Sequence, residues 1–173
     1  EQSLLEDGRK SNRLTKTTVN QESGIEHFAY TYDAHGNMCG MRHLGELVWD
    51  FKDQLHQVDL KGGGRAYYVY DSGGQRVRKV IESQNGQRRK ERLYLGGFEV
   101  YREFNGESTN VELERETLHV MDDEERIAIV DTQIKSGDDS NSIPQPVIRY
   151  QLGNHLGSEC IELDSDGSLL TCE

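Results

Sequence analysis

The chain has 173 residues, enough for one ordinary domain or part of a larger assembly and too few for two domains of typical size. It contains 16 Leu, 8 Ile, 11 Val and 4 Phe, about 23% of the residues, just above the ~20% below which disorder is expected. We therefore expect a fold around a thin apolar layer. The net charge is −11, and residues 87–173 carry 19 acidic against 9 basic groups, which opposes binding to nucleic acids and anionic membranes. The longest apolar run, Ile127 to Val130, is far shorter than the ~20 residues that span a bilayer.

Turn-forming pairs and triplets rich in Gly, Asn and Asp interrupt the chain more often than a helical protein tolerates. Apolar and polar residues alternate between these turns, in the segments 28–32, 98–104, 111–120, 127–130, 148–152 and 161–163. This period of two is typical of half-buried strands, so we expect an all-β protein of antiparallel hairpins, with about ten to twelve strands and no helix. Leu118 and Val120 have the opposite parity to Val111 and Leu113, which predicts a bulge or bend near residues 115–117.

One polar stretch, residues 135–146, contains both prolines and lacks alternation, so it is expected to be a flexible loop. It divides the sequence into repeated hairpins over residues 1–134 and a shorter segment over residues 147–173, with structure resuming at Val147.

One sequence pattern recurs four times and is the most informative feature for predicting the fold. A carboxylate is followed three residues later by a residue able to adopt a positive φ. Asp accepts backbone N–H bonds at the first turn position, and Gly takes the left-handed position that closes a hairpin with a bulge. The offset predicts structural turns at Asp33–Gly36, Asp50–Asp53, Asp71–Gly74 and Asp164–Gly167.

Aromatic residues precede most of these turns. We expect their rings to cover the turns and to stack on equivalent rings of the next hairpin, forming a ladder along a continuous sheet. The residues concerned are Tyr30, Tyr32, Trp49 and Tyr70.

The ordered set of motifs resembles the YD-repeat or RHS (rearrangement hot spot) proteins. Tyr30 to Asn37 reads YTYDAHGN and is similar to the YxYDxxGN signature of that family. Residues 149–158, followed by 163–167, resemble the opening of the RHS-associated core. Other segments are similar to repeat variants or to the C component of bacterial insecticidal toxin complexes and related polymorphic toxins: residues 11–15, 49–55, 68–76, 93–101 and 116–122.

The resemblance implies a spiral β-sheet that winds into a hollow shell around a C-terminal toxic polypeptide. The present chain would be a non-catalytic segment of that wall, secreted with its parent. Its partners would be the remainder of the shell, the toxin cargo and other toxin-complex subunits. A sheet one layer thick needs less apolar volume than a two-layer domain, and the lean composition independently favours such a wall.

Two patterns suggest metal ligands. Glu162, Asp164, Asp166, Gly167 and Glu173 follow part of the EF-hand template, but the segment alternates as a strand, so we expect a hairpin turn there. A second group is spaced at four-residue intervals but lacks the further ligands that zinc requires; it comprises His35, Cys39 and His43. We therefore expect neither a metal nor another cofactor.

Catalytic and phosphate-binding patterns are also incomplete. His155 lies near Ser158 and Cys160, but no nucleophile elbow or triad spacing accompanies it, so we expect it to hold a tight turn. The Gly-rich segment 61–65 lacks the order of a phosphate-binding loop. The basic stretch Arg88 to Arg92 is expected to be a solvated hairpin end.

Three hypotheses remain. The first is the structural wall segment. The second is a carbohydrate-binding sheet, in which exposed Tyr and Trp side chains stack on sugar rings. The third, an enzyme, has the least support because the sequence offers no recognisable catalytic constellation.

Overall fold

The computed structural model describes residues 2–4, 10–21, 24–106, 109–123, 125–136, 143–153 and 159–172. In these ranges the regular structure is β-strand apart from one short 3-10 turn, η1 (Lys61–Gly63), so the predicted all-β class is confirmed. Within the same ranges, no helix has the length and apolarity needed to cross a membrane. The predicted sites at His155 and Ser158 lie outside the described residues.

Four short strands begin the chain and form two separate hairpins: β1 (Gln2–Leu4) with β2 (Lys10–Leu14), and β3 (Lys16–Gln21) with β4 (Gly24–Ala29). The remaining strands are β5 (Thr31–Tyr32), β6 (Met38–Met41), β7 (Leu44–Trp49), β8 (Leu55–Asp59), β9 (Arg65–Tyr70), β10 (Arg76–Glu82), β11 (Arg88–Leu95), β12 (Phe98–Phe104), β13 (Val111–Asp122), β14 (Glu125–Lys135), β15 (Pro146–Gly153), β16 (Glu159–Leu163) and β17 (Leu169–Cys172).

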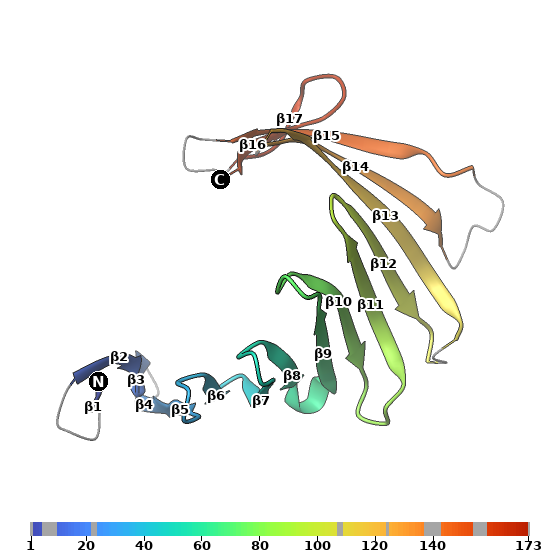
Figure 1. Ribbon diagram of the computed structural model, residues 1–173. Coiled ribbons are helices and arrows are strands. Elements are labelled where there is room, and N and C mark those ends of the chain that lie inside the picture. The colour runs from blue at the N-terminus through green and yellow to red at the C-terminus, as the bar shows by residue number, and fades with distance from the viewer. Residues whose placement is uncertain are drawn as a thin grey trace.

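Strands β5 to β17 form one antiparallel sheet of 13 strands, in which spatial order equals chain order. Figure 1 shows this sheet as an open arch of a single layer, with the two ends of the chain facing each other across the opening. The predicted curved sheet of hairpin repeats is thus confirmed. The estimate of ten to twelve strands was too low, because strands as short as β5 and β6 contain too few residues for alternation to reveal them.

The apolar layer is thin, as the composition predicts. Eight of the described hydrophobic residues are buried, and Leu47, Val58 and Ala66 form a cluster among them. Ala128 and Ile129 are only 5% and 7% exposed although consecutive strand residues point to opposite faces. Side chains from neighbouring strands of the same sheet therefore cover both faces, without a second layer.

Directly paired residues of adjacent strands share a face of the sheet, so the register defines two faces. The first, called here the Glu91 face, carries Val80, Glu91, Arg102 and Glu114. The second, called the Tyr101 face, carries the row Tyr68, Lys79, Arg92, Tyr101 and Arg115.

The bulge or bend predicted near residues 115–117 is confirmed in part: the register of β13 with β14 shifts between Glu114 and Arg115, but the register with β12 does not shift there. β13 pairs with β12 in unbroken register from Leu113 opposite Glu103 to Leu118 opposite Phe98. Leu113 and Leu118 differ in parity because they lie on opposite faces, both of which carry apolar residues in a single layer. The irregularity is on β14, where the pairing steps from Lys135 opposite Glu114 to Gln133 opposite Arg115.

The expected loop over residues 135–146 is described in part. β14 continues to Lys135 and β15 begins at Pro146; the described residues between them, 136 and 143–145, lie outside strands, and residues 137–142 lie outside the description.

Candidate functional site

The four turns predicted from the Asp offset have one backbone geometry. In each, the Asp N–H donates to the carbonyl four residues later, and the residue three positions on donates back to the Asp carbonyl; at Asp71 these N···O distances are 2.9 and 3.2 Å. The third residue has a positive φ in every case, which closes a three-residue hairpin loop with a bulge. These φ values are 99° at Gly36, 59° at Asp53, 85° at Gly74 and 80° at Gly167.

The carboxylate of each turn organises the loop. Asp71 Oδ1 accepts the backbone N–H of Gln75 at 2.9 Å, and Asp164 Oδ1 accepts that of Ser168 at 2.8 Å. Asp33 Oδ1 accepts the N–H groups of Gly36 and Asn37, both at 2.8 Å. Desolvation favours a higher pKa for Asp33, but these hydrogen bonds to the ionised form outweigh it and lower the pKa.

Aromatic residues preceding three of the turns tie them to earlier parts of the chain. Trp49 Nε1–H donates to the carbonyl of Met38 at 2.8 Å, and Tyr70 O–H donates to the carbonyl of Leu55 at 3.0 Å. Met38 and Leu55 each directly follow the preceding turn. The hydroxyl of Tyr32 likewise reaches the Leu14 carbonyl at 2.7 Å. Sequence reasoning did not predict these bonds to the backbone, because they depend on the distance between hairpins.

Tyr30 has a related role near the start of the chain. Its hydroxyl lies 3.0 Å from Thr17 Oγ1, and its backbone N–H donates to the Thr15 carbonyl at 2.9 Å. Tyr30 thus connects the β3–β4 hairpin to the beginning of the long sheet.

A fifth turn of the same geometry was missed because Ser replaces Asp. Ser83 N–H donates to the Gln87 carbonyl at 2.9 Å, Gly86 N–H donates back to Ser83 at 3.0 Å, and Gly86 has a φ of 80°. The Asn85–Gly86 pair marked a turn in the sequence. Ser83 Oγ donates to the Gln87 carbonyl at 3.1 Å, while Asn85 Oδ1 accepts the Gln87 N–H at 3.1 Å, so the local bonds differ from those of an Asp turn. Extending the offset to Ser would have found the motif.

The first two turns of the long sheet are joined by side chains. His35 Nδ1 lies 2.7 Å from Asp53 Oδ1, and Asn37 Nδ2 donates to Asp53 at 2.8 Å and to Asp33 at 3.0 Å. The hydrogen bond to Asp53 raises the pKa of His35, and reciprocally the bond from His35 lowers the pKa of Asp53. His35 is thus part of a contact between turns, while Cys39 Sγ lies 3.4 Å from the Asn37 carbonyl.

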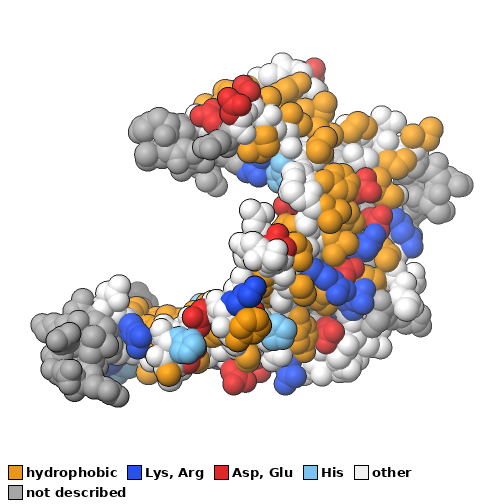
Figure 2. Space-filling model, in the orientation of Figure 1, with side chains coloured by type: hydrophobic (Ala, Val, Ile, Leu, Met, Phe, Trp, Pro, Cys, Tyr) orange, Lys and Arg blue, Asp and Glu red, His pale blue; other side chains and the backbone are white. Residues whose placement is uncertain are grey.

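A ladder of alternating charges crosses four strands on the Glu91 face. Arg78 donates twice to Glu91, at 2.5 and 2.8 Å; Arg102 lies 3.7 Å from the same carboxylate and donates to Glu114 at 2.6 Å. Arg88 approaches Glu91 at 3.6 Å. Glu91 is only 5% exposed, so the prediction of a solvated end at residues 88–92 is wrong there. On the face seen in Figure 2, blue and red side chains lie together among orange ones over the middle of the arch.

A second polar network crosses the Tyr101 face between β11 and β14. Glu99 accepts from Arg92 at 2.8 Å and lies 3.2 Å from His119 Nε2, whose ring Nδ1 is 3.0 Å from Arg126. Arginine only donates, so Nδ1 is the acceptor in that contact and Nε2 faces the Glu99 carboxylate. His119 therefore joins a carboxylate on one strand to a guanidinium on another.

The network continues to β16. Gln151, buried on β15, accepts from Arg126 at 2.6 Å and donates to Glu162 at 2.7 Å. Arg149 donates to Asp131 at 2.6 Å, and Thr117 donates to the same carboxylate at 2.5 Å. Polar side chains on the Tyr101 face thus fix the register of six neighbouring strands, where a two-layer protein would use apolar packing.

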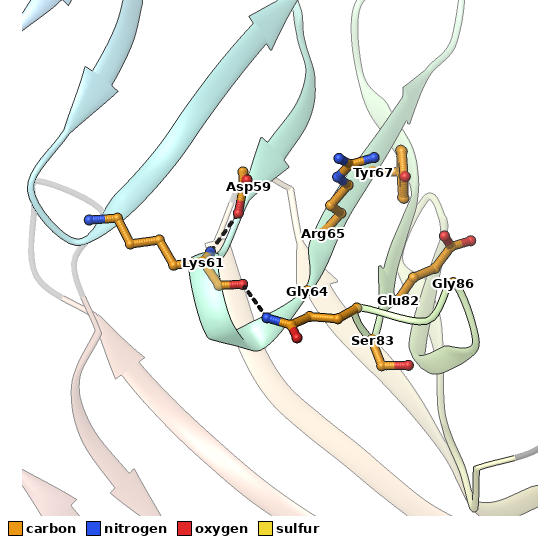
Figure 3. Close-up of a pocket in the computed structure, with 9 residues that line it drawn as sticks. Asp59, Lys61, Gly64, Arg65, Tyr67, Glu82, Ser83 and Gly86 are labelled. Carbon is orange, nitrogen blue, oxygen red and sulfur yellow. Dashed lines mark hydrogen bonds between the residues drawn. The ribbon is translucent and has the colours of Figure 1, made fainter.

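A polar pocket of about 320 Å³ lies between the η1 connection and the β10–β11 turn. Figure 3 shows Arg65, Tyr67 and Glu82 along its strands, with Lys61 bound through its backbone to the Asp59 carboxylate. Gly64 is essential to this close approach, because a Cβ there would lie 1.9 Å from the Glu82 carbonyl oxygen. The Gly-rich segment 61–65 thus allows the backbone at Gly64 to approach the backbone at Glu82 closely.

The candidate metal ligands do not converge where they are described. Among those residues, no group of three or more His, Cys, Asp or Glu side chains is placed to hold a metal ion. Asp164 and Gly167 form the hairpin turn already described, Glu173 lies outside the description, and His35 is bonded to Asp53.

Comparisons with known proteins identify the fold. No family model and no curated protein matches the sequence. Among solved structures, the crystal structure of TcdB2-TccC3-TEV is 20% identical, with a TM-score of 0.65 over 91% of this chain. The Photorhabdus luminescens Tc holotoxin pore is 22% identical, with a TM-score of 0.66 over 99% of this chain. The chain spans 9% of the length of each of these matched chains.

At this level of identity the likeness establishes the fold. It extends over almost the whole arch, including the hairpin repeats whose turns are described above. The resemblance to RHS-type toxin-complex proteins that the sequence predicts is therefore confirmed, and this chain has the fold of a segment of the TcdB2-TccC3 structures.

Proposed function

We propose that the chain is a non-catalytic wall segment of a secreted RHS-type shell that encloses a C-terminal toxin cargo. The observation that carries the proposal is the open, single-layer, 13-stranded sheet, whose fold matches toxin-complex structures. Its partners are the rest of the shell, the cargo and other subunits of a toxin complex.

The edges of the sheet support this proposal. β5 and β17 are the terminal strands of the 13-strand order, so each has one side without a partner in that sheet. Leu169 and Leu170 on β17 are 62% and 50% exposed. An exposed apolar edge strand is a template for further pairing, and in a longer wall the next hairpin covers it.

The polar networks also suit a wall. A partition between two aqueous spaces has to be stable with both faces wet, and here ion pairs on both faces tie neighbouring strands together. The carbohydrate-binding alternative needs exposed rings, whereas Trp49 and Tyr70 are only partly exposed and their polar groups bond to backbone carbonyls.

Electron microscopy of the complete parent polypeptide, combined with limited proteolysis, tests the proposal. We expect the arch to continue at both edges into a closed hollow wall, and the polypeptide that follows it to resist protease until the wall is opened with denaturant. A parent in which these strands form an isolated arch, or in which the downstream polypeptide is digested as fast as a free peptide, would contradict the containment role.

A further inference from the structure

A row of cations and tyrosines crosses the Tyr101 face at directly opposed positions. Lys79 on β10 is opposite Tyr68 on one side and Arg92 on the other; Arg92 is opposite Tyr101, which is opposite Arg115. The Arg92 guanidinium lies 5.2 Å from the Tyr101 ring centroid, and that of Arg115 lies 5.5 Å from the same centroid. The rings hold these cations in place by cation–π attraction.

A register shift adds another cation to this row. The pairing of β10 with β9 is irregular between Arg76 and Arg78, and Arg76 reaches the Tyr101 face. Its guanidinium lies 4.9 Å from the Tyr94 ring centroid and 5.7 Å from that of Tyr68. Lys79 Nζ lies 5.8 Å from the Tyr68 centroid. Three cations, on residues 76, 79 and 92, are thereby gathered around β10.

This arrangement is electrostatically unfavourable in the chain alone. Lys79 and Arg92 are directly opposite, a position in which like charges destabilise a sheet. Glu99 neutralises Arg92, but neither Arg76 nor Lys79 has a carboxylate within ion-pair distance among the described residues. Burial, together with Arg76 and Arg92, lowers the pKa of Lys79. The chain has 31 acidic residues, yet none of the described ones neutralises Arg76 or Lys79, so these positive charges could be balanced by a bound anion.

A cavity accompanies the cluster. It has a volume of about 290 Å³ and is lined by Lys79, Ile81, Lys90, Arg92, Tyr94 and Tyr101, with Glu91 also at its wall. The Glu91 carboxylate is engaged with arginines on the other face, and Lys90 pairs with Glu103 at 3.0 Å. The cations of the cavity lining that remain to meet a ligand are therefore Lys79 and Arg92, the second of which also pairs with Glu99.

We propose that this cavity is a binding site for a tetrahedral dianion, a phosphate or sulfate group, held by Lys79 and Arg92, with Arg76 beside the Tyr94 ring that lines it. The three cations less the Glu99 carboxylate leave a local charge of +2, which a dianion balances and a single carboxylate does not. Arginine and lysine both suit such oxyanions, the first through its planar fork and the second as a point charge. The site lies in mid-sheet, where both neighbours of each strand are paired, so side chains rather than backbone hold the ligand.

Calorimetric titration of the purified protein with inorganic phosphate tests the site. A parallel titration with glucose 6-phosphate distinguishes a free ion from an ester, and sodium chloride at matched ionic strength is the blank. We expect saturable binding of phosphate at one site, and binding that is weaker by about tenfold or more in Lys79→Gln. Removing a cation that faces Arg92 relieves repulsion, so this variant should keep the fold and melt no lower than the wild type without phosphate.

The matched control is Lys52→Gln, which makes the same charge change on an exposed turn outside the cavity. It should bind phosphate as the wild type does. Binding of glucose 6-phosphate as well as phosphate would identify the ligand as an ester group, and binding of phosphate alone would identify it as the free ion. Heats equal to those of the chloride blank, or equal loss of binding in the Lys79 and Lys52 variants, would overturn the proposal.

Discussion

Replacing Glu91 with Gln tests whether the charge ladder stabilises the sheet. The carboxylate is 5% exposed, accepts two hydrogen bonds from Arg78 and lies within 4 Å of Arg88 and Arg102. A hydrogen bond to a charged group contributes about 1.5–3 kcal/mol. The arginine side chains are 31–39% exposed and regain water when the charge is lost, so we expect a net loss of about 2 kcal/mol in the free energy of unfolding.

Urea denaturation followed by circular dichroism measures this loss. For a chain of this length, about 2 kcal/mol corresponds to a decrease of about 4–8 °C in Tm. The slope of the transition should stay constant, since the surface exposed on unfolding is unchanged. The control is Glu112→Gln, which neutralises an exposed carboxylate on β13. Because Glu91 is buried, added salt should reduce the difference only slightly. Equal midpoints for the two variants would refute the role assigned to the ladder.

Three further changes probe the turns and the contacts between hairpins. Gly64→Ala should lower the free energy of unfolding by at least about 3 kcal/mol, because Gly64 has a φ of 91° and a Cβ there would clash with the Glu82 backbone. Gly86→Ala should lower it by only about 1 kcal/mol, because the space around that Cβ is open. Equal losses would contradict the argument that Gly64 allows the two backbones to approach closely. Tyr70→Phe removes one hydrogen bond to a backbone carbonyl and should cost about 1 kcal/mol by urea denaturation; an unchanged midpoint would show that the bond contributes nothing. An NMR titration should place the pKa of His35 above 6.5, and in Asp53→Asn this pKa should return toward 6.5. The contact stabilises the fold at pH values between the lowered pKa of Asp53 and the raised pKa of His35; its contribution is lost as the pH falls through the pKa of Asp53 or rises through that of His35. A His35 pKa that the substitution leaves unchanged would exclude the pair.

The turns were the most predictable part of the fold because their chemistry is local. Such a turn has two requirements: a carboxylate that accepts backbone N–H groups, and a residue three positions later that tolerates a positive φ. Asp71 and Gly74 meet them, and both can be recognised within four consecutive residues of the sequence. The Asn85–Gly86 pair marked the Ser83 turn, but the Asp offset did not include it, because Asn85 Oδ1 rather than an Asp carboxylate accepts the Gln87 N–H there. Strand alternation likewise predicted the all-β class, but not the shortest strands.

The cross-strand networks could not be predicted because they depend on register. In the segment 88–92, the sequence shows four basic residues around Glu91, a composition typical of solvated surface. Pairing of β11 with β10 and β12 brings Arg78 and Arg102 to the carboxylate from 13 and 11 residues away and buries it. The row through Lys79 depends on the same register, and no sequence spacing signals it.

Agreement between spatial order and chain order along β5 to β17 has a consequence for biosynthesis. Each of these strands needs only its immediate predecessor and successor, so the loops closed during folding are short and the entropy lost in closing them is small. A nascent chain can therefore acquire native pairing hairpin by hairpin as it emerges, without waiting for distant segments to be synthesised. An all-β architecture ordinarily folds slowly because its partners are far apart along the polypeptide; this one has the local connectivity usually associated with helical bundles.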